Sequence, residues 1–346
     1  MLGKNLKYYR LRSRLTKKEL ADRVGVSAMA ITHYENEERK PGIDILRKLA
    51  GELGVRLADF LTIRNDSHQY AHYEFRKNSS LTKNDREFIC ESVEEYFDRF
   101  FTVVDALGGE VLPACPEIRC VPVGHDAEET ARLLREHLGF AADGPIQNII
   151  GAMENKGILL FCCSIENEHF SGMNGTVDGR PYIILNTNMT PERQRSTLAH
   201  ELAHVFCIFP DDLTEKECED FATAISGAFL CPQKDMIREL GIKRTRITSD
   251  MLMVAREYGV STLLLMKRAN ILGIITDTLY KDFMIQASRK GWRKNEPSRI
   301  PEETTNLFEQ LTIRAVNEDE MSEQRGAELL NISYDEFARM IHVQEA

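Results

Sequence analysis

The sequence predicts a multidomain protein with an all-α head, an α+β middle domain and a helical C-terminal tail. Short amphipathic helices separated by tight turns predict the head, and apolar segments of strand length between helical runs predict the α+β domain. At 346 residues the chain can bury two or three cores. We place the domains at residues 1–63 (head), 64–125 (helical connector), 126–247 (middle domain) and 248–346 (tail).

Composition describes an ordinary globular chain, with 42% hydrophobic and 28% charged residues. No apolar run approaches the roughly 18 residues of a membrane span, and the basic N-terminus has no export signal, so we expect a cytoplasmic protein without a membrane partner. Eight cysteines without a C-x-x-C pair predict reduced thiols. Zinc ligation by Cys115 and Cys120 is the less favoured alternative.

Charge is unevenly distributed. Residues 1–63 hold 13 Lys and Arg against 8 Asp and Glu, a net of +5, whereas the remaining residues hold 31 against 46, a net of −15. Any nucleic-acid contact is therefore expected in the head. Residues 315–346 carry a net of −6, which favours packing or protein contact there.

The head begins with a strong helix signal. Thr16 and Glu19 form a capping box that opens a predicted helix over Lys17–Val24. Gly25 supplies the turn, and Ser27 caps a second helix over Ala28–Asn36. Two short helices joined by such a turn predict a helix-turn-helix.

The string TKKELADRVGVSAMAITHYENEERKPGIDILRKLAGELGVRLADF resembles the XRE (lambda-repressor-like) family. In that family the second helix enters the DNA major groove. The resemblance implies base-facing positions at Ser27, Ala28, Met29, Thr32 and His33, and phosphate contacts from Arg12, Lys17 and Lys18. Lys17 stands where many relatives hold Gln, and the leading turn of the second helix offers no Arg, Gln or Asn for bidentate base contacts. The alternative is a helical module for protein contact only.

The connector and middle domain contain several predicted elements. Residues 67–80 are polar and read as a hinge, and Thr82 opens a long aromatic-lined helix ending near Gly108-Gly109. Its aromatic stripe must be buried on the next domain or in a dimer interface. Residues 113–122 read as irregular. Further expected elements are helices over 126–138 and 146–155, a strand over 158–165, a hairpin turn at Asp178-Gly179 and a strand over 181–186.

The most informative motif is His200-Glu201-Leu202-Ala203-His204, an H-E-x-x-H within a helical run expected over 195–208. Imidazoles four residues apart share one face of a helix and can bind a single metal ion. Glu201 is then placed as the general base of a hydrolase. The alternative is a chance occurrence on an exposed helix, and a structural zinc site is a second alternative to catalysis.

A following helical segment, residues 219–232, offers a third ligand. Together the two segments resemble the ImmA/IrrE metallopeptidase family. The resemblance implies Zn²⁺ as cofactor, a zincin-like fold, and Glu219 as third ligand because it lies thirteen residues before Pro232, with Glu217 and Asp220 as fallbacks. Departures are Ser196, Ala203 and Ile225-Ser226. Matching residues are Arg193, Arg195, Thr197, Leu198, Ala199, His200, Glu201, His204, Glu219, Ala222, Leu230 and Pro232.

The strand before the H-E-x-x-H helix carries a further expectation. In zinc peptidases of this layout, a sheet edge beside the metal holds an extended substrate by strand addition. We expect that role for Tyr182, Ile183, Ile184, Leu185 and Asn186.

The tail repeats a feature of the head. The pattern Ala21…Gly25-Val-Ser27 recurs as Ala255…Gly259-Val-Ser261 and as Ala327…Asn331-Ile-Ser333. Two further helix-turn-helix-like units are therefore expected in residues 250–274 and 318–341. A similar tail accompanies fused proteins of the two families.

These observations predict a DNA-binding regulator with a zinc-peptidase module. The resemblances imply an antitoxin or a phage or mobile-element repressor of its own operon, with double-stranded operator DNA, a protein substrate or cognate toxin, and a second copy of the chain as partners. One alternative is a non-catalytic antitoxin that uses zinc structurally and binds a toxin. A weaker alternative is a metabolite-sensing regulator.

Overall fold

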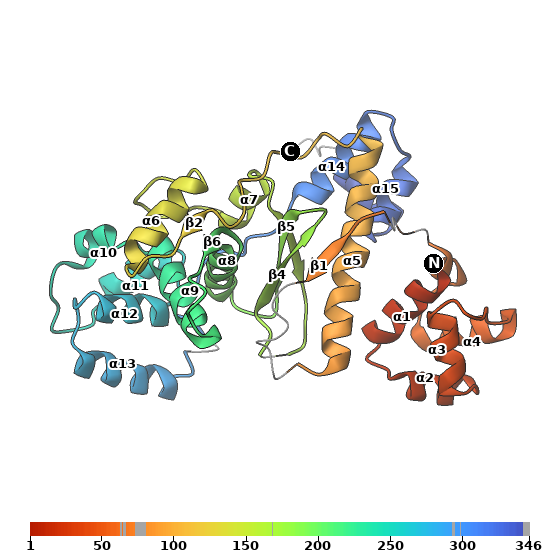
Figure 1. The fold of residues 1–346 in the computed structure, drawn as a ribbon, viewed down its shortest axis with the longest axis horizontal. Helices are drawn as coiled ribbons and strands as arrows, with labels where there is room; N and C mark the ends of the chain where they lie inside the picture. Colours follow the sequence, from red (N-terminus) through yellow and green to blue (C-terminus); the bar gives the residue numbers. More distant parts are fainter. Residues whose placement is uncertain are drawn as a thin grey trace. The chain divides into compact units, whose positions relative to one another are not determined.

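A computed structural model describes residues 1–62, 64, 67–72, 81–167, 169–292, 295–297 and 299–341. The chain forms two compact units (Figure 1). Unit 1 comprises Met1–Tyr70, Phe75–Val111 and Phe308–Ala346, and unit 2 comprises Ala71–Glu74 and Leu112–Leu307. The predicted mixture of an all-α head, an α+β region and a helical C-terminal part is confirmed. Within these ranges, no helix combines the length and apolarity that a bilayer span requires.

Unit 1 opens with the head, where the two predicted helices are present. Thr16 Oγ1 accepts from the Glu19 amide, and the Glu19 carboxylate accepts from the Thr16 amide, so the capping box is confirmed. Gly25 has φ +77°, and Ser27 caps the second helix. The head elements are α1 (Leu2–Arg12), α2 (Lys17–Val24), α3 (Ala28–Glu35), α4 (Ile43–Leu53) and the 3₁₀ turn η1 (Leu57–Leu61).

A buried ion pair fixes α3 against α1. Arg10 Nε donates to Glu35 Oε1 at 2.5 Å and Arg10 Nη2 to Glu35 Oε2 at 3.1 Å. The third guanidinium nitrogen donates to the Leu15 carbonyl. Both side chains are 2% exposed, and a bidentate pair of this kind sets the orientation of one helix on another.

The rest of unit 1 joins a long helix, α5 (Lys83–Ala106), to helices from the other end of the chain. Phe308 lies edge-on to Tyr96 and Phe100 of α5, with ring centroids 5.3 and 5.6 Å away. The aromatic stripe is thus covered from within the chain, in part by the C-terminal helices and in part by α1 and His68. The C-terminal helices are α14 (Leu307–Asn317), α15 (Glu323–Leu330) and α16 (Tyr334–Ile341).

Unit 2 is built on a four-stranded sheet with the order β1-β4-β5-β3. The hairpin turn at Asp178-Gly179 is confirmed, with both residues at positive φ. The strands are β1 (Tyr70–His72), β3 (Leu159–Cys163), β4 (Gly172–Val177) and β5 (Arg180–Asn186), where β5 pairs antiparallel with β4 and parallel with β3.

Three short strands differ from the sequence expectations, since β6 (Cys207–Ile208) also replaces the end of the helix expected over 195–208. Strand β1 lies inside the segment read as a hinge, of which residues 73–80 fall outside the described ranges. Strand β2 (Val121–Pro122) closes the segment read as irregular, and it pairs with β6. Each is only two or three residues long and is defined by a distant partner, so local sequence patterns did not reveal it.

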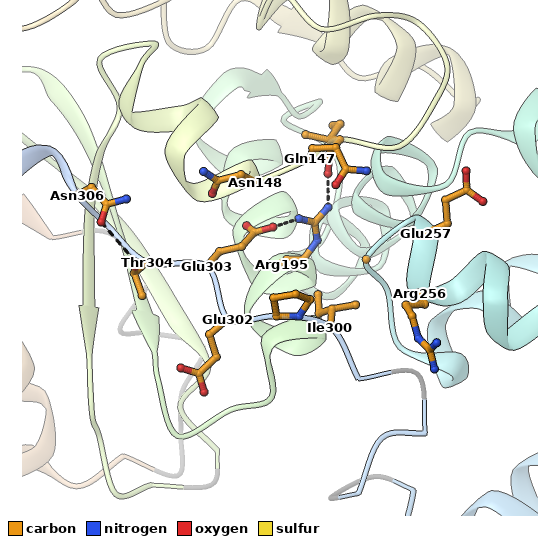
Figure 2. A pocket seen from close by; sticks show the side chains of 13 residues that line it. Gln147, Asn148, Arg195, Arg256, Glu257, Ile300, Glu302, Glu303, Thr304 and Asn306 are labelled. Atoms are coloured by element: carbon orange, nitrogen blue, oxygen red, sulfur yellow. Dashed lines mark hydrogen bonds and ion pairs between the residues drawn. The ribbon is translucent and has the colours of Figure 1, made fainter. Parts of the chain in front are cut away.

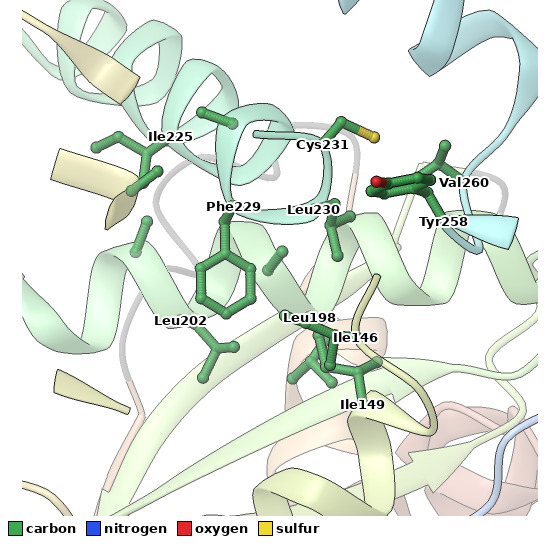
Figure 3. Packing of buried hydrophobic residues seen from close by; sticks show 14 of the residues in the cluster. Ile146, Ile149, Leu198, Leu202, Ile225, Phe229, Leu230, Cys231, Tyr258 and Val260 are labelled. Atoms are coloured by element: carbon green, nitrogen blue, oxygen red, sulfur yellow. The ribbon is translucent and has the colours of Figure 1, made fainter. Parts of the chain in front are cut away.

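Helices cover one face of this sheet. Ile183 and Leu185 of β5 belong to the same buried cluster as Leu198 and Leu202 of α8, and Figure 3 shows Phe229 of α9 above α8. The helices of unit 2 are α6 (Ala127–His137), α7 (Ile149–Glu154), α8 (Pro191–Phe206), α9 (Glu215–Leu230), α10 (Gln233–Leu240), α11 (Ser249–Glu257), α12 (Thr262–Ile271) and α13 (Asp277–Arg289), of which α7 and α8 contact the sheet directly.

The helix that carries the H-E-x-x-H motif starts and ends earlier than the expected residues 195–208, and it ends earlier because Cys207 and Ile208 form strand β6. We predicted a start at residue 195, but α8 begins at Pro191, because Thr190 caps it and proline suits the first helical position. The added turn contributes Glu192, whose carboxylate accepts from the Ile300 amide.

Candidate functional site

Three side chains from α8 and α9 converge on one point. The Nε2 atoms of His200 and His204 face each other at 3.1 Å. Glu219 reaches them from α9, with Oε1 2.9 Å from His204 Nε2 and Oε2 3.4 Å from His200 Nε2. The structure therefore brings together all three residues expected as zinc ligands.

The donor set fits a zinc ion. Two imidazole nitrogens and one carboxylate form a common catalytic zinc set, and ligand atoms about 2.0–2.1 Å from a tetrahedral ion lie on the order of 3.3 Å apart. The observed separations of 2.9–3.4 Å match that spacing. His204 is 6% exposed and His200 is 20% exposed, which leaves the point accessible from the His200 side.

The fallback ligands and the alternative cysteines lie apart from this cluster. Glu217 caps its own helix by accepting from Thr214 at 2.6 and 2.8 Å. Over the described ranges, His200, His204 and Glu219 form the only group of three or more acidic, His or Cys side chains close enough to hold a metal ion, so neither Asp220 nor Cys115 belongs to one. The Cys120 sulfur contacts the His137 ring instead.

Glu201 lies beside the cluster and is held from the sheet. Its Oε2 accepts a 2.7 Å hydrogen bond from Asn174 Nδ2, and both residues are buried. Asn174 is on β4 opposite Ile183, so it points to the helix-covered face. Sequence reasoning missed Asn174, although an Asn within an otherwise apolar or small strand segment, Met173-Asn174-Gly175, was a signal.

The N-terminal half of α8 anchors a different feature. Arg195 Nη2 donates to the Ile146 carbonyl at 2.5 Å, and its guanidinium pairs with Glu303 (Figure 2). These residues line a cavity of about 420 Å³ that also carries Arg256, Glu257 and Glu302 and includes none of the predicted site residues. Gly259 lies against Arg195, since a Cβ there would sit 2.5 Å from Arg195 Nε.

The expectation of an open sheet edge at Tyr182–Asn186 is wrong. These residues belong to β5, which pairs with β4 on one side and β3 on the other. All five side chains are fully buried. Because both rows of backbone groups are already paired, this strand cannot accept an added strand.

The residues expected to contact DNA lie on α1, α2 and α3 of the head, with Ser27 as the cap of α3. Ser27, Ala28 and Met29 are exposed at the start of α3, with Met29 62% exposed. Thr32 and His33 follow on α3 and are half-buried, and the His33 ring pairs with Glu38. Arg12 and Lys18 are exposed, whereas Lys17 Nζ is 3.4 Å from Glu35 Oε2.

Comparison with known proteins gives two family matches. Residues 6–60 match a helix-turn-helix family, and residues 153–270 match a peptidase family whose domain is described as IrrE N-terminal-like. No curated protein matched the chain. One similar solved structure is Bacillus thuringiensis PlcR in complex with the peptide PapR7 and DNA, at 12% identity, 98% coverage of this chain and 95% of that chain. The TM-score is 0.18.

The second match spans α8 and α9 with all three converging side chains, and extends through α12. The first covers the whole predicted helix-turn-helix. This chain is therefore a fusion of an XRE-type helix-turn-helix domain with an IrrE N-terminal-like domain of a peptidase family.

Proposed function

We propose that this protein is a DNA-binding regulator whose second domain is a zinc-dependent peptidase acting on a protein. The observation that carries the proposal is the convergence of His200, His204 and Glu219 beside the buried carboxylate of Glu201. Zinc held by these three side chains would supply a Lewis acid for a substrate carbonyl and would make water more acidic.

The chain's own residues supply the proton transfers. Glu201 takes a proton from the water that attacks the scissile carbonyl and then delivers it to the leaving amine nitrogen as the C–N bond breaks. Asn174 fixes the carboxylate by holding Oε2 at 2.7 Å. A fixed base requires little reorganisation during the reaction.

The head would direct this activity to an operator. The exposed start of α3 presents Ser27, Ala28 and Met29 for base contacts, and Arg12, Lys17 and Lys18 provide charge for phosphates. We further propose repression of its own operon as a homodimer, in an antitoxin or mobile-element setting, with the peptidase acting on a toxin or another protein partner. The basic balance of the head relative to the acidic remainder supports this division of roles.

The test uses zinc-loaded full-length protein and a peptide library made from a bacterial proteome, with new termini identified by mass spectrometry. Wild type should hold about one zinc per chain and cleave the library. Glu201→Gln should keep its zinc and lose about 100-fold or more of the cleavage rate. Glu217→Gln is the matched control, because Glu217 lies on the same helix as Glu219 but only caps it.

Two other outcomes would contradict the proposal. Zinc binding unaffected by His204→Ala would remove the metal centre from these residues. Full zinc occupancy without cleavage, both by wild type and by the strand β1 variant Ala71→Pro described below, would overturn the peptidase and favour the non-catalytic antitoxin, in which the metal stabilises a toxin-binding domain.

A further inference from the structure

A short segment between the head and α5 is part of the sheet in unit 2. Ala71 and His72 of β1 lie beside β4 at the end of the sheet (Figure 1). Tyr70 before this segment and α5 after it belong to unit 1, whereas Ala71 and His72 belong to unit 2. The sheet thus gains an edge strand that lies far from it in sequence.

Two contacts dock β1 on the sheet. At Gly175 of β4, an added Cβ would be 2.2 Å from the Tyr182 hydroxyl oxygen and 2.4 Å from the Ala71 carbonyl oxygen, so the joint approach of Tyr182 and β1 requires glycine. His72 Nδ1 lies 2.5 Å from the hydroxyl oxygen of Tyr182, a fully buried residue of β5. The end of the Tyr182 ring lies over Gly175 of β4, so its hydroxyl meets the His72 side chain at the β1 side of that strand.

The covered edge belongs to the strand nearest the proposed base. Gly175 directly follows Asn174, which donates to Glu201. With β5 on one side and β1 on the other, β4 has both neighbours in place. Strand β5 lies inside the sheet and offers no free edge. The side of β4 that faces β1 is therefore the edge near the metal cluster at which an extended peptide could pair.

We propose that β1 is a resident strand that covers the substrate edge of the peptidase, and that an extended segment of the protein substrate must replace it. This inference rests on the proposed peptidase function. A three-residue strand contributes few backbone hydrogen bonds, so it can open locally while the rest of the sheet stays folded. Substrate can bind only while β1 has left the edge. The apparent affinity for substrate is therefore the intrinsic affinity multiplied by the fraction of time that the edge is open.

The test compares wild type with Ala71→Pro, which removes a backbone N–H from β1 and disfavours its pairing. Ala71→Ser is the matched control, because it keeps the N–H and nearly the same size. Hydrogen exchange of the β4 peptide, residues 172–177, measures whether the edge is covered. Cleavage of the proteome-derived peptide library by the zinc-loaded full chain measures whether β1, by occupying the edge of β4, slows the peptidase.

Ala71→Pro should exchange the β4 amides about tenfold faster and cleave the library about tenfold faster, with Ala71→Ser matching wild type. His72→Ala should shift both readouts in the same direction by a smaller factor. Unchanged exchange in Ala71→Pro would show that β1 does not cover the edge. Faster exchange with equal or slower cleavage would show that the covered edge is not the substrate surface.

The failure of the peptidase itself would look different. If zinc-loaded wild type and Ala71→Pro both leave the library intact, the peptidase proposal and the inhibitory role of β1 are overturned together. Hydrogen exchange would still decide whether β1 covers β4.

Discussion

The helix pairs α2–α3 in the head and α11–α12 in unit 2 share one turn pattern and present opposite surfaces. In each, a buried Ala precedes a Gly at positive φ, and a Ser caps the second helix. In the head, the second helix begins with exposed residues, of which Met29 is 62% exposed. In unit 2 the corresponding start is Thr262, which is fully buried.

Buried polar contacts account for the difference. Thr262 donates from both its amide and its hydroxyl to Glu296 Oε1, at 2.9 and 2.6 Å. Arg268, further along α12, donates to the Cys231 carbonyl and to Glu128. The helix end that would enter a DNA groove is therefore packed into its own domain. The same turn sequence can therefore occur in a helix pair whose second helix is exposed and in one whose second helix is buried in its domain. The exposure of the residues that follow the turn distinguishes the two.

The two glycines should respond most differently to substitution. Gly25 has open space around its Cβ position, so Gly25→Ala should cost only about 1 kcal/mol for its positive φ. Gly259→Ala adds a clash with the buried Arg195 guanidinium and should cost about 3 kcal/mol or more. Fluorescence of Trp292, the single tryptophan, follows unit 2 during urea unfolding. Hydrogen exchange of α2–α3 measures the stability of the head. Equal losses of stability in Gly25→Ala and Gly259→Ala would show that Arg195 readily moves away from residue 259.

The first residue of the second helix gives the next largest contrast. Thr262→Val removes the hydroxyl bonded to the buried Glu296 and should destabilise unit 2 by about 2 kcal/mol. Ala28→Thr in the head, at an exposed site, should change stability by about 0.5 kcal/mol or less. Urea unfolding monitored by Trp292 measures the first, and hydrogen exchange of α2–α3 measures the second. A neutral Thr262→Val would contradict the packing role.

For DNA binding we expect the opposite order, with a larger effect of substitution in the head pair α2–α3 than in α11–α12. Met29→Glu places a carboxylate on the exposed start of α3 and should weaken binding to operator DNA about tenfold. Leu263→Glu, at the matching half-buried position of α12, should leave DNA affinity unchanged. Fluorescence anisotropy at constant salt, on variants shown by circular dichroism to be folded, measures both. If Leu263→Glu weakened DNA binding and Met29→Glu did not, the DNA contact would have to be assigned to unit 2.

The smallest and most similar effects are expected at the caps. Ser27 accepts from the Ala30 amide and Ser261 from the Leu264 amide, both at 3.1 Å. Ser→Ala at either site should cost about 1 kcal/mol. A much larger loss at Ser261, in the same unfolding measurements, would indicate that packing and the cap are coupled in α12.

Local sequence predicted the parts of the fold that depend on neighbouring residues. The capping box at Thr16, the hairpin turn at Asp178-Gly179 and the repeated helix-turn pattern all depend on residues a few positions apart. Helical spacing alone also brings His200 and His204 together. Glu219 came from family resemblance, and its role as ligand stays a prediction.

Features built from distant residues were not predictable in the same way. Asn174 meets Glu201 across 27 positions, Arg195 meets Glu303 across 108, and His72 meets Tyr182 across 110. No periodic pattern encodes such pairings. The three-residue strand β1 exists only through its neighbour β4, and the placement of the substrate on β5 failed for the same reason.

The covering of α5 by the C-terminal helices has a consequence for protein synthesis. Arg99 donates to the Leu329 carbonyl, 230 positions later, and Phe308 covers the rings of Tyr96 and Phe100. At about 5–20 residues per second, a ribosome needs roughly 10–50 s to make the intervening chain. Throughout that interval the nascent α5 presents its aromatic face without these partners, while the four head helices can already fold. Chaperones that bind exposed aromatic segments would therefore meet this protein at α5 during its translation.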